Sequence, residues 1–521
     1  MTKLLFTSVY KPFGTNDFYN CPSAPMEFFM SNIGDEGLFT IRAIEPTYSL
    51  QYLAQNIETP STVLDFPTRK EFIKEIRKNY DYVCIGFMSL AFEKVRDMCK
   101  LVRKYSPSSK IVLGGYGTVI PEASEIADYV CREEGVNFMK NLLNEKKFSE
   151  IKQAWEPYNS KYSIMGTKLM SKKTKPGLVL VALGCTGGCE FCNTSYFFHK
   201  KKIYILKTAE EIYKALKHQN TNYIMIVDEN FLENKKLVKS LGKIIKKNND
   251  SFDLMCFGTL KAVSEYTPEE LLEIGINKIW ISAESKFVKY PKLHKIDIKK
   301  LTSSLHNSGI HLIISFIIGY PFHNKEKLKE DINYFLSLSG EFKQYHIYTA
   351  PPGTPLYSSL KKQNKLLNRP WKEYDASHLM FKHPYFSKKE LEKIKINIKK
   401  NELKDSGPSL IRFIETKLLR YKKYKNSGNK FLARNAKEAG LECHNLLPLV
   451  YTSKLFVNKK IKNNISNLIK EIEKNLGKRT ANQKLLAPIL IFRALMLNAR
   501  IKLFGSSADQ PDTQIIEYNF S

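Results

Sequence analysis

The sequence lacks an apolar run long enough to cross a membrane. Its strongest run, IHLIISFIIGYP at residues 310–321, is far shorter than the roughly 20 residues that a spanning helix needs. The N-terminal MTKLLFTSVYKPFG has too short an apolar stretch for a secretory signal, and no small-residue cleavage site follows it. We therefore expect a soluble, cytoplasmic protein without a transmembrane segment, and peripheral contact with a membrane stays an open alternative.

The chain also has little cysteine, no repeat and no low-complexity tract. Its 9 cysteines are spread over 521 residues, and apart from one triplet their spacing is irregular. This pattern argues against a secreted domain held together by disulfides. The hydrophobic fraction of 43% and the chain length are sufficient for two to four buried cores.

Acidic residues are scarce relative to basic ones. The chain has 82 Lys and Arg against 52 Asp and Glu, which gives a net charge of +30. Such a charge favours an anionic partner, such as nucleic acid, a phosphorylated substrate or acidic lipid. The alternative is that the basic side chains only lie on solvent-exposed faces and bind no partner. The lysines recur along the whole chain instead of clustering, so we prefer the second interpretation and do not expect a nucleic-acid partner.

Residues 1–150 alternate between continuous apolar segments and amphipathic ones. This alternation predicts an α/β domain of the Rossmann type, with a parallel sheet covered on both faces. Ligands of such sheets bind at the carboxyl ends of the strands. The expected strands are 3–10, 61–67, 81–89 and 110–117, and the expected helices are 47–57, 71–80, 92–105 and 136–143.

A second βα series follows an irregular, polar segment at 151–175 that we interpret as a linker. Residues 176–375 contain six strand–helix alternations, which predict a parallel barrel or a partial (β/α)6 barrel of the TIM type. Chemistry in such folds lies at the carboxyl ends of the strands. The expected strands are 177–184, 222–230, 252–260, 277–285, 311–321 and 344–352.

Residues 376–521 are expected to form a basic, helical domain. Helices are predicted at 388–404, 409–424, 463–476 and 484–505. The last of them mixes apolar residues with Arg493, Arg500 and Lys502, which suits either core packing or a helix lying in a membrane interface. Core packing is the preferred interpretation, because such stripes are more common in cores. The polar tail at 506–521 is expected to be loosely held.

Three cysteines stand close together in GCTGGCEFC, residues 184–192, directly after the first strand of the second series. Three thiolates can hold a [4Fe–4S] cluster and leave one of its four irons open. The glycines at 184, 187 and 188 allow the backbone to curl tightly around such a group. The alternatives are a zinc site with His199 as fourth ligand, whose spacing lies outside the usual Cys/His patterns, and a purely structural role for the thiols.

The CxxxCxxC spacing, with an aromatic residue before the last cysteine, resembles the radical S-adenosylmethionine (SAM) superfamily. The resemblance implies that the open iron of a [4Fe–4S] cluster binds SAM. It also implies that reduction by an external flavodoxin- or ferredoxin-type donor cleaves SAM to a 5′-deoxyadenosyl radical, which abstracts hydrogen from the substrate. The implied cluster ligands, which also form the catalytic set, are Cys185, Cys189 and Cys192.

Later strand ends resemble the same superfamily, and the resemblance covers residues 175–360 approximately. IVDENF at 226–231, WISAES at 280–285, FIIGYP at 316–321 and APPGTPLY at 350–357 stand in the expected order. A carboxylate suits the SAM ammonium group at close range. The implied SAM-binding residues are Phe191, Asp228, Glu229, Asn230, Ser282, Glu284, Ile317 and Gly319.

The first domain resembles the cobalamin-binding domain that precedes the barrel in one class of this superfamily. The similar pieces are TVLDFP, YDYVCIGFMS, IVLGGYGTVIPE and ADYVCREEGV. The implied cobalamin-binding residues are Thr62, Gly86, Ser89, Gly114, Gly115, Gly117, Glu134 and Gly135.

The sequence departs from the cobalamin-binding pattern in two places. The DxHxxG signature is absent, as it is in many members of the class, and Glu133 stands where a GEGE-like turn has glycine. The alternatives are therefore an ordinary Rossmann-like glycine turn and a degenerate domain that no longer binds cobalamin.

The resemblance to this class implies that a protein with both cofactors methylates an unactivated carbon, here in a small-molecule or lipid-like substrate. The same class contains ring cyclisation and rearrangement enzymes and lipid-modifying methylases, so radical chemistry without methyl transfer is one alternative. A second alternative is an RNA-modifying iron–sulfur enzyme, whose usual RNA-binding β-barrel or additional cluster cysteines do not occur in this sequence.

Overall fold

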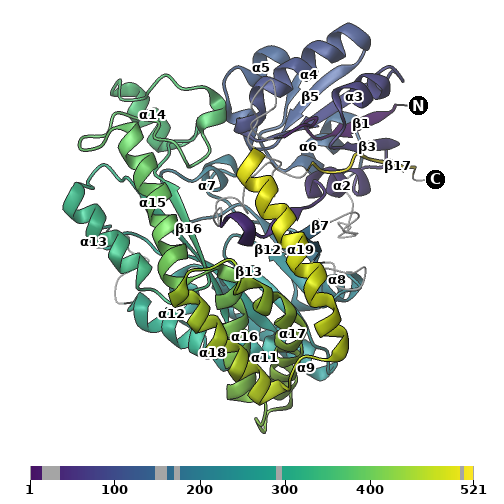
Figure 1. Cartoon of the computed structure of the whole chain (residues 1–521). Coiled ribbons are helices and arrows are strands. Elements are labelled where there is room, and N and C mark those ends of the chain that lie inside the picture. Colours follow the sequence, from purple (N-terminus) through teal and green to yellow (C-terminus); the bar gives the residue numbers. More distant parts are fainter. Residues whose placement is uncertain are drawn as a thin grey trace.

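The computed structural model describes residues 2–13, 36–146, 161–168, 176–288, 296–504 and 510–519. Two six-stranded sheets dominate it. In Figure 1 the first sheet and its helices form the upper right of the molecule, the second sheet lies below it, and helices from the C-terminal third cover the front.

The first sheet is doubly wound, as predicted. Five of its strands are parallel, in the order β3-β1-β4-β5-β6. The order reverses between β1 and β4, and ligands of open α/β sheets bind at the carboxyl edge near such a reversal. The strands are β1 (Leu4–Thr7), β3 (Ser61–Asp65), β4 (Tyr82–Gly86), β5 (Lys110–Gly114) and β6 (Tyr129–Val130), and the main helices are α2 (Tyr48–Gln55), α3 (Arg69–Ile76), α4 (Phe92–Tyr105) and α6 (Gly135–Leu143).

The C-terminal tail contributes a strand to this sheet. β17 (Gln514–Tyr518) pairs antiparallel with β3, with Ile515 opposite Leu64, and both chain ends lie beside this edge in Figure 1. The expectation of a loosely held tail is therefore wrong for residues 514–518. Backbone groups along an edge strand offer pairing to any extended segment, whatever the polarity of its side chains.

The second sheet is parallel and follows chain order from β9 to β16. In the part of the chain that the structure describes, β9 and β16 do not pair, so the barrel is open, as the partial-barrel prediction has it. Its strands are β9 (Gly177–Leu180), β12 (Tyr223–Val227), β13 (Asp253–Phe257), β14 (Ile276–Ser282), β15 (His311–Ile318) and β16 (Phe342–Ile347). The helices between them are α8 (Ala209–His218), α9 (Lys235–Lys247), α11 (Pro268–Ile274), α12 (Ile298–Asn307) and α13 (Lys325–Leu336).

Part of the predicted linker is a hairpin. β7 (Lys161–Ile164) and β8 (Thr167–Lys168) pair with each other, and β7 pairs with β2 (Arg42–Ile44). The turn residues Met165 and Gly166 both have left-handed φ values, 51° and 73°, as two-residue hairpin turns require. The prediction of an irregular segment is wrong here, and residues 151–160 and 169–175 lie outside the described part of the chain.

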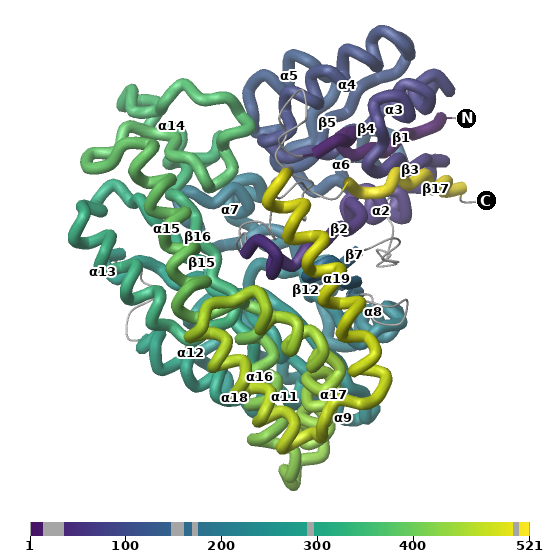
Figure 2. The backbone as a smooth tube through the Cα atoms, viewed as in Figure 1, coloured from purple at the N-terminus to yellow at the C-terminus, as the bar shows by residue number. Residues whose placement is uncertain are grey.

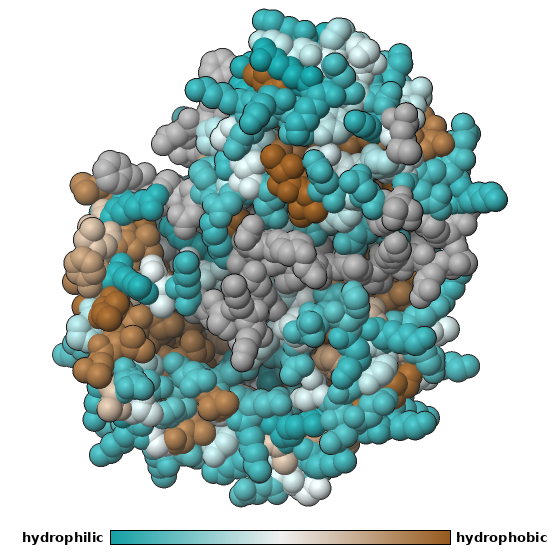
Figure 3. All heavy atoms as spheres, turned by 90° about the vertical axis from the view of Figure 1, so that its right-hand side faces the viewer, coloured by the Kyte–Doolittle hydropathy of each residue, from teal (hydrophilic) through white to brown (hydrophobic). Residues whose placement is uncertain are grey.

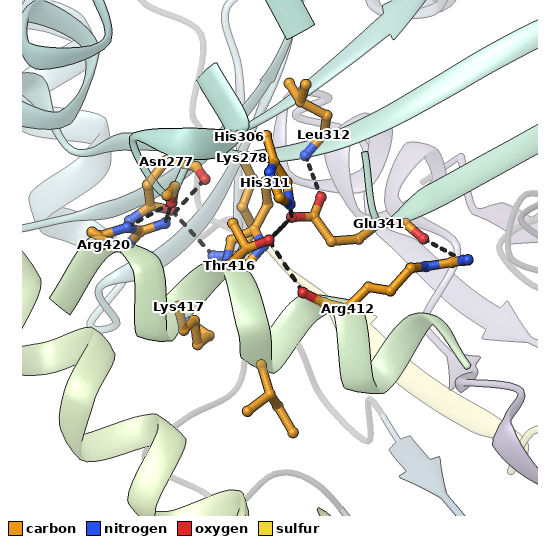
Figure 4. Close-up of polar contacts among 12 residues, drawn as sticks. Asn277, Lys278, His306, His311, Leu312, Glu341, Arg412, Thr416, Lys417 and Arg420 are labelled. Carbon is orange, nitrogen blue, oxygen red and sulfur yellow. Dashed lines mark hydrogen bonds and ion pairs between the residues drawn. The ribbon is translucent and has the colours of Figure 1, made fainter. Parts of the chain in front are cut away.

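Two of the C-terminal helices, α16 (Ser409–Tyr424) and α17 (Lys430–Ser453), dock on the amino-terminal end of the barrel strands. The buried Arg420 of α16 donates a hydrogen bond from Nε to the Gly309 carbonyl (2.8 Å) and another from Nη1 to Asn435 Oδ1 (3.0 Å). Nearby, the buried Glu341 carboxylate accepts the Leu312 N–H (2.8 Å) (Figure 4). This end lies opposite the catalytic edge of such barrels, which indicates a structural role. The C-terminal helices are α15 (Lys388–Ser406), α16, α17, α18 (Lys459–Leu476) and α19 (Ala481–Phe504).

We expect Arg420→Met to lower the free energy of unfolding by about 3 kcal/mol, because it leaves buried oxygen atoms without a donor. Denaturant unfolding measures this change. Lys422→Met on the same helix is the matched control, since it removes only the exposed ion pair with Glu471 and is expected to change stability by less than about 1 kcal/mol. Equal effects of the two substitutions on stability would contradict the structural role assigned to Arg420.

Most of the apolar residues of α19 do not pack in a core. Among its described side chains, residues 481–503, only Leu490 and Ala494 are buried, whereas Leu485, Phe492 and Leu503 are largely exposed. The preferred interpretation of this stripe as core packing is therefore wrong for its outer face. None of the described helices is both long and apolar enough to cross a membrane.

Candidate active site

The three cysteines occupy a tightly curled loop at the carboxyl end of the first barrel strand. Gly184 has a φ of 80°, and a Cβ atom there would lie 2.2 Å from the Lys201 carbonyl oxygen, so only glycine fits. The Ser195 hydroxyl donates to the Cys185 carbonyl (2.9 Å) and accepts the Gly188 N–H (2.9 Å). The loop is thereby tied to α7 (Asn193–Phe197), whose N-cap is Cys192.

The three thiols lie in a partly buried loop. Burial raises the pKa of Cys185 and Cys192, and binding to iron would remove those protons. Among the described side chains, no three His, Cys, Asp or Glu residues are placed to share one metal ion. Each cluster thiolate binds its own iron and need not converge with the others, whereas the zinc alternative with the exposed His199 has no support from this geometry.

A cavity of about 220 Å³ lies at the carboxyl ends of β12 to β15. Three predicted SAM-binding residues, Glu229, Ser282 and Glu284, line it together. Burial and, to a lesser extent, the charge of Glu229 raise the pKa of both Cys185 and Cys192, so this lining residue lies close to the cysteine loop. The sequence analysis missed further lining residues, although all lie in the predicted strand-end segments or their flanks: Phe257, Gly258, Thr259, Leu260, Trp280, Ile281 and Ser315.

Asp228 and Asn230 lie behind the wall of this cavity and support it. The buried Asp228 forms an ion pair with Lys202 (2.8 Å) and accepts the Asn230 N–H (2.8 Å). Asn230 Oδ1 in turn accepts the N–H of Thr259 (2.9 Å), which does line the cavity. Neither side chain is itself part of the wall, so their contribution is to hold the strand ends in register.

Ile317 and Gly319 belong to the end of β15 but do not line the cavity. Ile317 is half-buried. Gly319 has a φ of 81°, and a Cβ atom there would lie 2.8 Å from the Leu391 side chain of α15. The space at this glycine is therefore filled by the protein itself. The next residue, Tyr320, does reach the site, because its hydroxyl donates to Glu284 Oε2 (3.3 Å).

Phe191 anchors the cysteine loop to the last barrel strand. Its ring packs edge-on against Tyr348, with centroids 5.5 Å apart. The Tyr348 hydroxyl donates to Glu190 Oε1 (2.6 Å), so one tyrosine holds two neighbouring loop residues. Neither Tyr348 nor Glu190 has a predicted role, although Glu190 lies within the cysteine motif and Tyr348 within the expected strand 344–352.

A second cavity, of about 480 Å³, lies between the two sheets. From the first sheet it is lined by five of the predicted cobalamin-binding residues: Gly86, Gly114, Gly115, Glu134 and Gly135. From the barrel it is lined by Leu178, Leu180, Leu183 and Val227. Phe197 and Phe198 complete the wall. Since Phe197 is the last residue of the helix that begins after Cys192, this helix links the cysteine loop to the wall of the cavity.

Thr62, Ser89 and Gly117 do not line this cavity. Thr62 accepts the Tyr80 hydroxyl hydrogen (3.0 Å) inside the first domain, and Ser89 is buried. A Cβ atom on Gly117 would lie 2.3 Å from the Phe87 ring. These residues support the packing around the sheet edge.

Three features indicate that the larger cavity can hold a bulky ligand with hydrogen-bonding groups. At Gly114, nothing lies within 4 Å of where a Cβ atom would stand. The Tyr52 hydroxyl is buried in the cavity wall and has no hydrogen-bond partner among the residues that the structure describes. Burial raises the pKa of Glu45, another lining residue, to about 7. An apolar pocket with a few polar groups is typical of cofactor sites, and the amide-rimmed corrin ring of cobalamin fits this set.

Glu133 and Glu134 meet the same cavity in different ways. The Glu134 carboxylate caps α6 by accepting the N–H groups of Val136 (2.9 Å) and Asn137 (2.8 Å). Its place in the wall is therefore fixed by the helix that it caps. Glu133, which stands where glycine is usual, also lines the cavity without closing it.

We expect Gly114→Leu to weaken cobalamin binding by at least about tenfold, because the side chain would enter the open space of the larger cavity. Equilibrium binding of hydroxocobalamin, followed by absorbance, measures the effect. Gly428→Leu is the control, since that glycine also has open space around it but lies between α16 and α17. Unchanged binding by Gly114→Leu would contradict the placement.

Comparison with known proteins supports the interpretation of the barrel. Residues 179–335 match the family described as the radical SAM superfamily. An uncharacterized methyltransferase of Pyrococcus horikoshii is 24% identical over 230 residues, which are 42% of this chain and 49% of that protein. Bacteriochlorophyllide d C-12(1)-methyltransferase of Chlorobaculum tepidum is 22% identical over 214 residues, 39% of this chain and 46% of that protein.

A solved structure was also compared. The apo form of OxsB, a cobalamin-dependent SAM radical enzyme, has a TM-score of 0.46 and 14% identity, over 96% of this chain and 81% of that one. The chain spans about half the length of the curated relatives that it matches. The matched region contains the cysteine loop and the strand ends that line the smaller cavity. The chain therefore carries a radical SAM domain at residues 179–335.

Proposed function

We propose that this protein is a cobalamin-dependent radical SAM enzyme that methylates an unactivated carbon. In this proposal Cys185, Cys189 and Cys192 hold a [4Fe–4S] cluster, SAM occupies the smaller cavity and cobalamin the larger one. The observation that carries the proposal is the position of α7 and its flanks. Cys192 is the N-cap of this helix, and the other end of the helix forms part of the wall of the larger cavity.

When bound, the cluster would supply the electron that cleaves SAM, and cobalamin would carry the methyl group. The protein's own residues bind and orient these groups. The carboxylates of Glu229 and Glu284 face the smaller cavity and suit the cationic ammonium and sulfonium groups of SAM. The apolar side chains around the larger cavity exclude water from a reactive site.

Two further observations support methylation over the other reactions of this class. Two of the matched relatives are named as methyltransferases, one of them acting on a tetrapyrrole carbon. The larger cavity offers room for a methyl carrier next to the cluster loop. The RNA-modifying alternative gains no support, because the described C-terminal elements are helices and one edge strand instead of an RNA-binding barrel.

The test is anaerobic reconstitution followed by incubation with SAM, cobalamin and a strong reductant. We expect both 5′-deoxyadenosine and S-adenosylhomocysteine, the latter only when cobalamin is present. Mass spectrometry of both products, with SAM carrying a deuterated methyl group, measures them. Intact SAM under every reductant would refute the enzyme proposal. Formation of 5′-deoxyadenosine with no cobalamin-dependent S-adenosylhomocysteine would refute methyl transfer and favour cyclisation or rearrangement.

A further inference from the structure

α19 presents a continuous apolar face to solvent. Five side chains at spacings of 4, 3, 4 and 7 residues follow one side of this helix. Their exposed fractions are 74% for Leu485, 48% for Ile489, 63% for Phe492, 58% for Met496 and 75% for Leu503. Leu486 and Leu495, both about half exposed, widen the face. Exposed apolar residues are ordinary when scattered, but a contiguous face of this kind marks an interaction surface.

The opposite side of α19 is fixed to the molecule. Leu490 and Ala494 are buried in the core of the helical region. A Cβ atom on Gly166, in the β7–β8 hairpin, would lie only 3.1 Å from the Arg493 carbonyl oxygen. After α19 the chain continues to β17 in the first sheet, and Figure 2 shows the yellow helix crossing the front of the molecule between the helical region and that sheet. The helix is therefore anchored along its length.

The charged residues of α19 are all cationic. Lys484, Arg493, Arg500 and Lys502 are exposed, and residues 481–504 contain no Asp or Glu. Long cationic side chains beside an apolar face suit phosphate headgroups above acyl chains. Figure 3 shows the molecule from the right-hand side of Figure 1, so its left edge is the side that faces the viewer in Figure 1, where α19 lies. Hydrophobic side chains gather at this edge.

We propose that α19 is an interfacial helix that docks this protein on an anionic phospholipid bilayer. The helix has 24 residues and would lie along the surface over about 36 Å, with its apolar face among the acyl chains and its cations at the phosphates. The chain's net charge of +30 adds attraction to such a surface. A protein partner is less well served, because protein interfaces are depleted in lysine, and Lys484 and Lys502 lie on this helix. The proposal is independent of the radical chemistry.

The net charge alone would draw the protein to anionic vesicles, so the test must report insertion of the helix. Phe492→Trp places a fluorophore on the apolar face. We expect its emission to shift to the blue and to be quenched by phosphatidylglycerol–phosphatidylcholine vesicles with brominated acyl chains, but not by phosphatidylcholine vesicles alone. Ile396→Trp is the matched control, because Ile396 is 54% exposed on α15, apart from α19 in Figures 1 and 2. Equal quenching of the two variants, or none, would overturn the proposal.

A second variant separates apolar insertion from charge attraction in the full chain. Phe492→Asp combined with Met496→Asp should weaken partitioning into the same vesicles by at least about tenfold, whereas Ile396→Asp should leave it within about twofold. Vesicle flotation measures both. Undiminished flotation of the double variant would refute the proposal. The proposal would also be refuted if the wild type did not bind vesicles and instead formed a dimer, detected by light scattering, that the double variant loses. The apolar face would then join two copies of the chain.

Discussion

Replacing Cys185, Cys189 or Cys192 with alanine is expected to abolish both the iron–sulfur absorbance of the reconstituted protein and its cleavage of SAM. Each thiolate would bind a different iron, so no neighbouring cysteine can take over the lost position. Within the described residues the other cysteines are buried elsewhere, as at Cys99 and Cys256. Iron and sulfide analysis, absorbance near 400 nm and chromatography of 5′-deoxyadenosine measure the losses, which we expect to be at least about a thousandfold for SAM cleavage.

Cys99→Ala provides the control for these variants. Cys99 is buried in α4 of the first domain, far along the chain from the loop, and its replacement should leave cluster content and SAM cleavage unchanged. Stoichiometric zinc without iron in the wild-type protein would contradict the cluster assignment. Full iron content in a protein that lacks one of the three cysteines would contradict it as well.

The architecture of both sheets is predictable from this sequence. The strands of the first sheet are buried on both faces, and those of the second alternate buried with half-buried residues. The segments around Val83 and Ile314 are continuous apolar runs between amphipathic helices. This difference between strand and helix patterns can be recognised in a single sequence. The first residues of some helices can also be recognised in the sequence. Thr208 and Glu211 form a capping box at α8, and Thr267 and Glu270 form one at α11, as their spacing predicts.

The elements that the sequence did not reveal owe their order to partners far away in the chain. β17 is ordered by the open edge of β3, and the β7–β8 hairpin by β2 and the helical core. Their own side chains are mixed in polarity, so no periodic pattern identifies them. The outer face of α19 was misjudged for the opposite reason, since its apolar residues predict burial and only the packing shows which of them stay exposed.

Of the candidate site, too, one part could be predicted from the sequence and another could not. Glu229, Ser282 and Glu284 were predicted from separate strand ends, and the parallel sheet brings them to one cavity, as the geometry of such sheets requires. Glycines were harder to interpret. Gly114 opens to the larger cavity, whereas Gly117 and Gly319 admit the side chains of Phe87 and Leu391. A sequence shows that the backbone is approached closely at a glycine, but not whether a ligand or the protein approaches it.

Among the residues of the smaller cavity, Glu284 is expected to contribute most to binding of SAM. It is nearly fully buried, it lines the cavity and its Oε2 accepts the Tyr320 hydroxyl hydrogen (3.3 Å). A carboxylate held in this way is oriented before the ligand arrives, and a charged hydrogen bond to the SAM ammonium group would form in a site shielded from water. We expect Glu284→Gln to raise the Kd for SAM by about 10- to 100-fold, measured by equilibrium dialysis with the reconstituted protein.

Glu265→Gln is the matched control for that substitution, because Glu265 is exposed and makes only a long ion pair with Lys235 (3.8 Å). Its Kd for SAM should equal that of the wild type. Tyr320→Phe should give a smaller loss, about threefold, since the carboxylate keeps its charge and loses only its orienting hydroxyl. If Glu284→Gln binds SAM as the wild type does while cluster content is unchanged, SAM does not contact this carboxylate, and the smaller cavity must hold another part of the substrate complex.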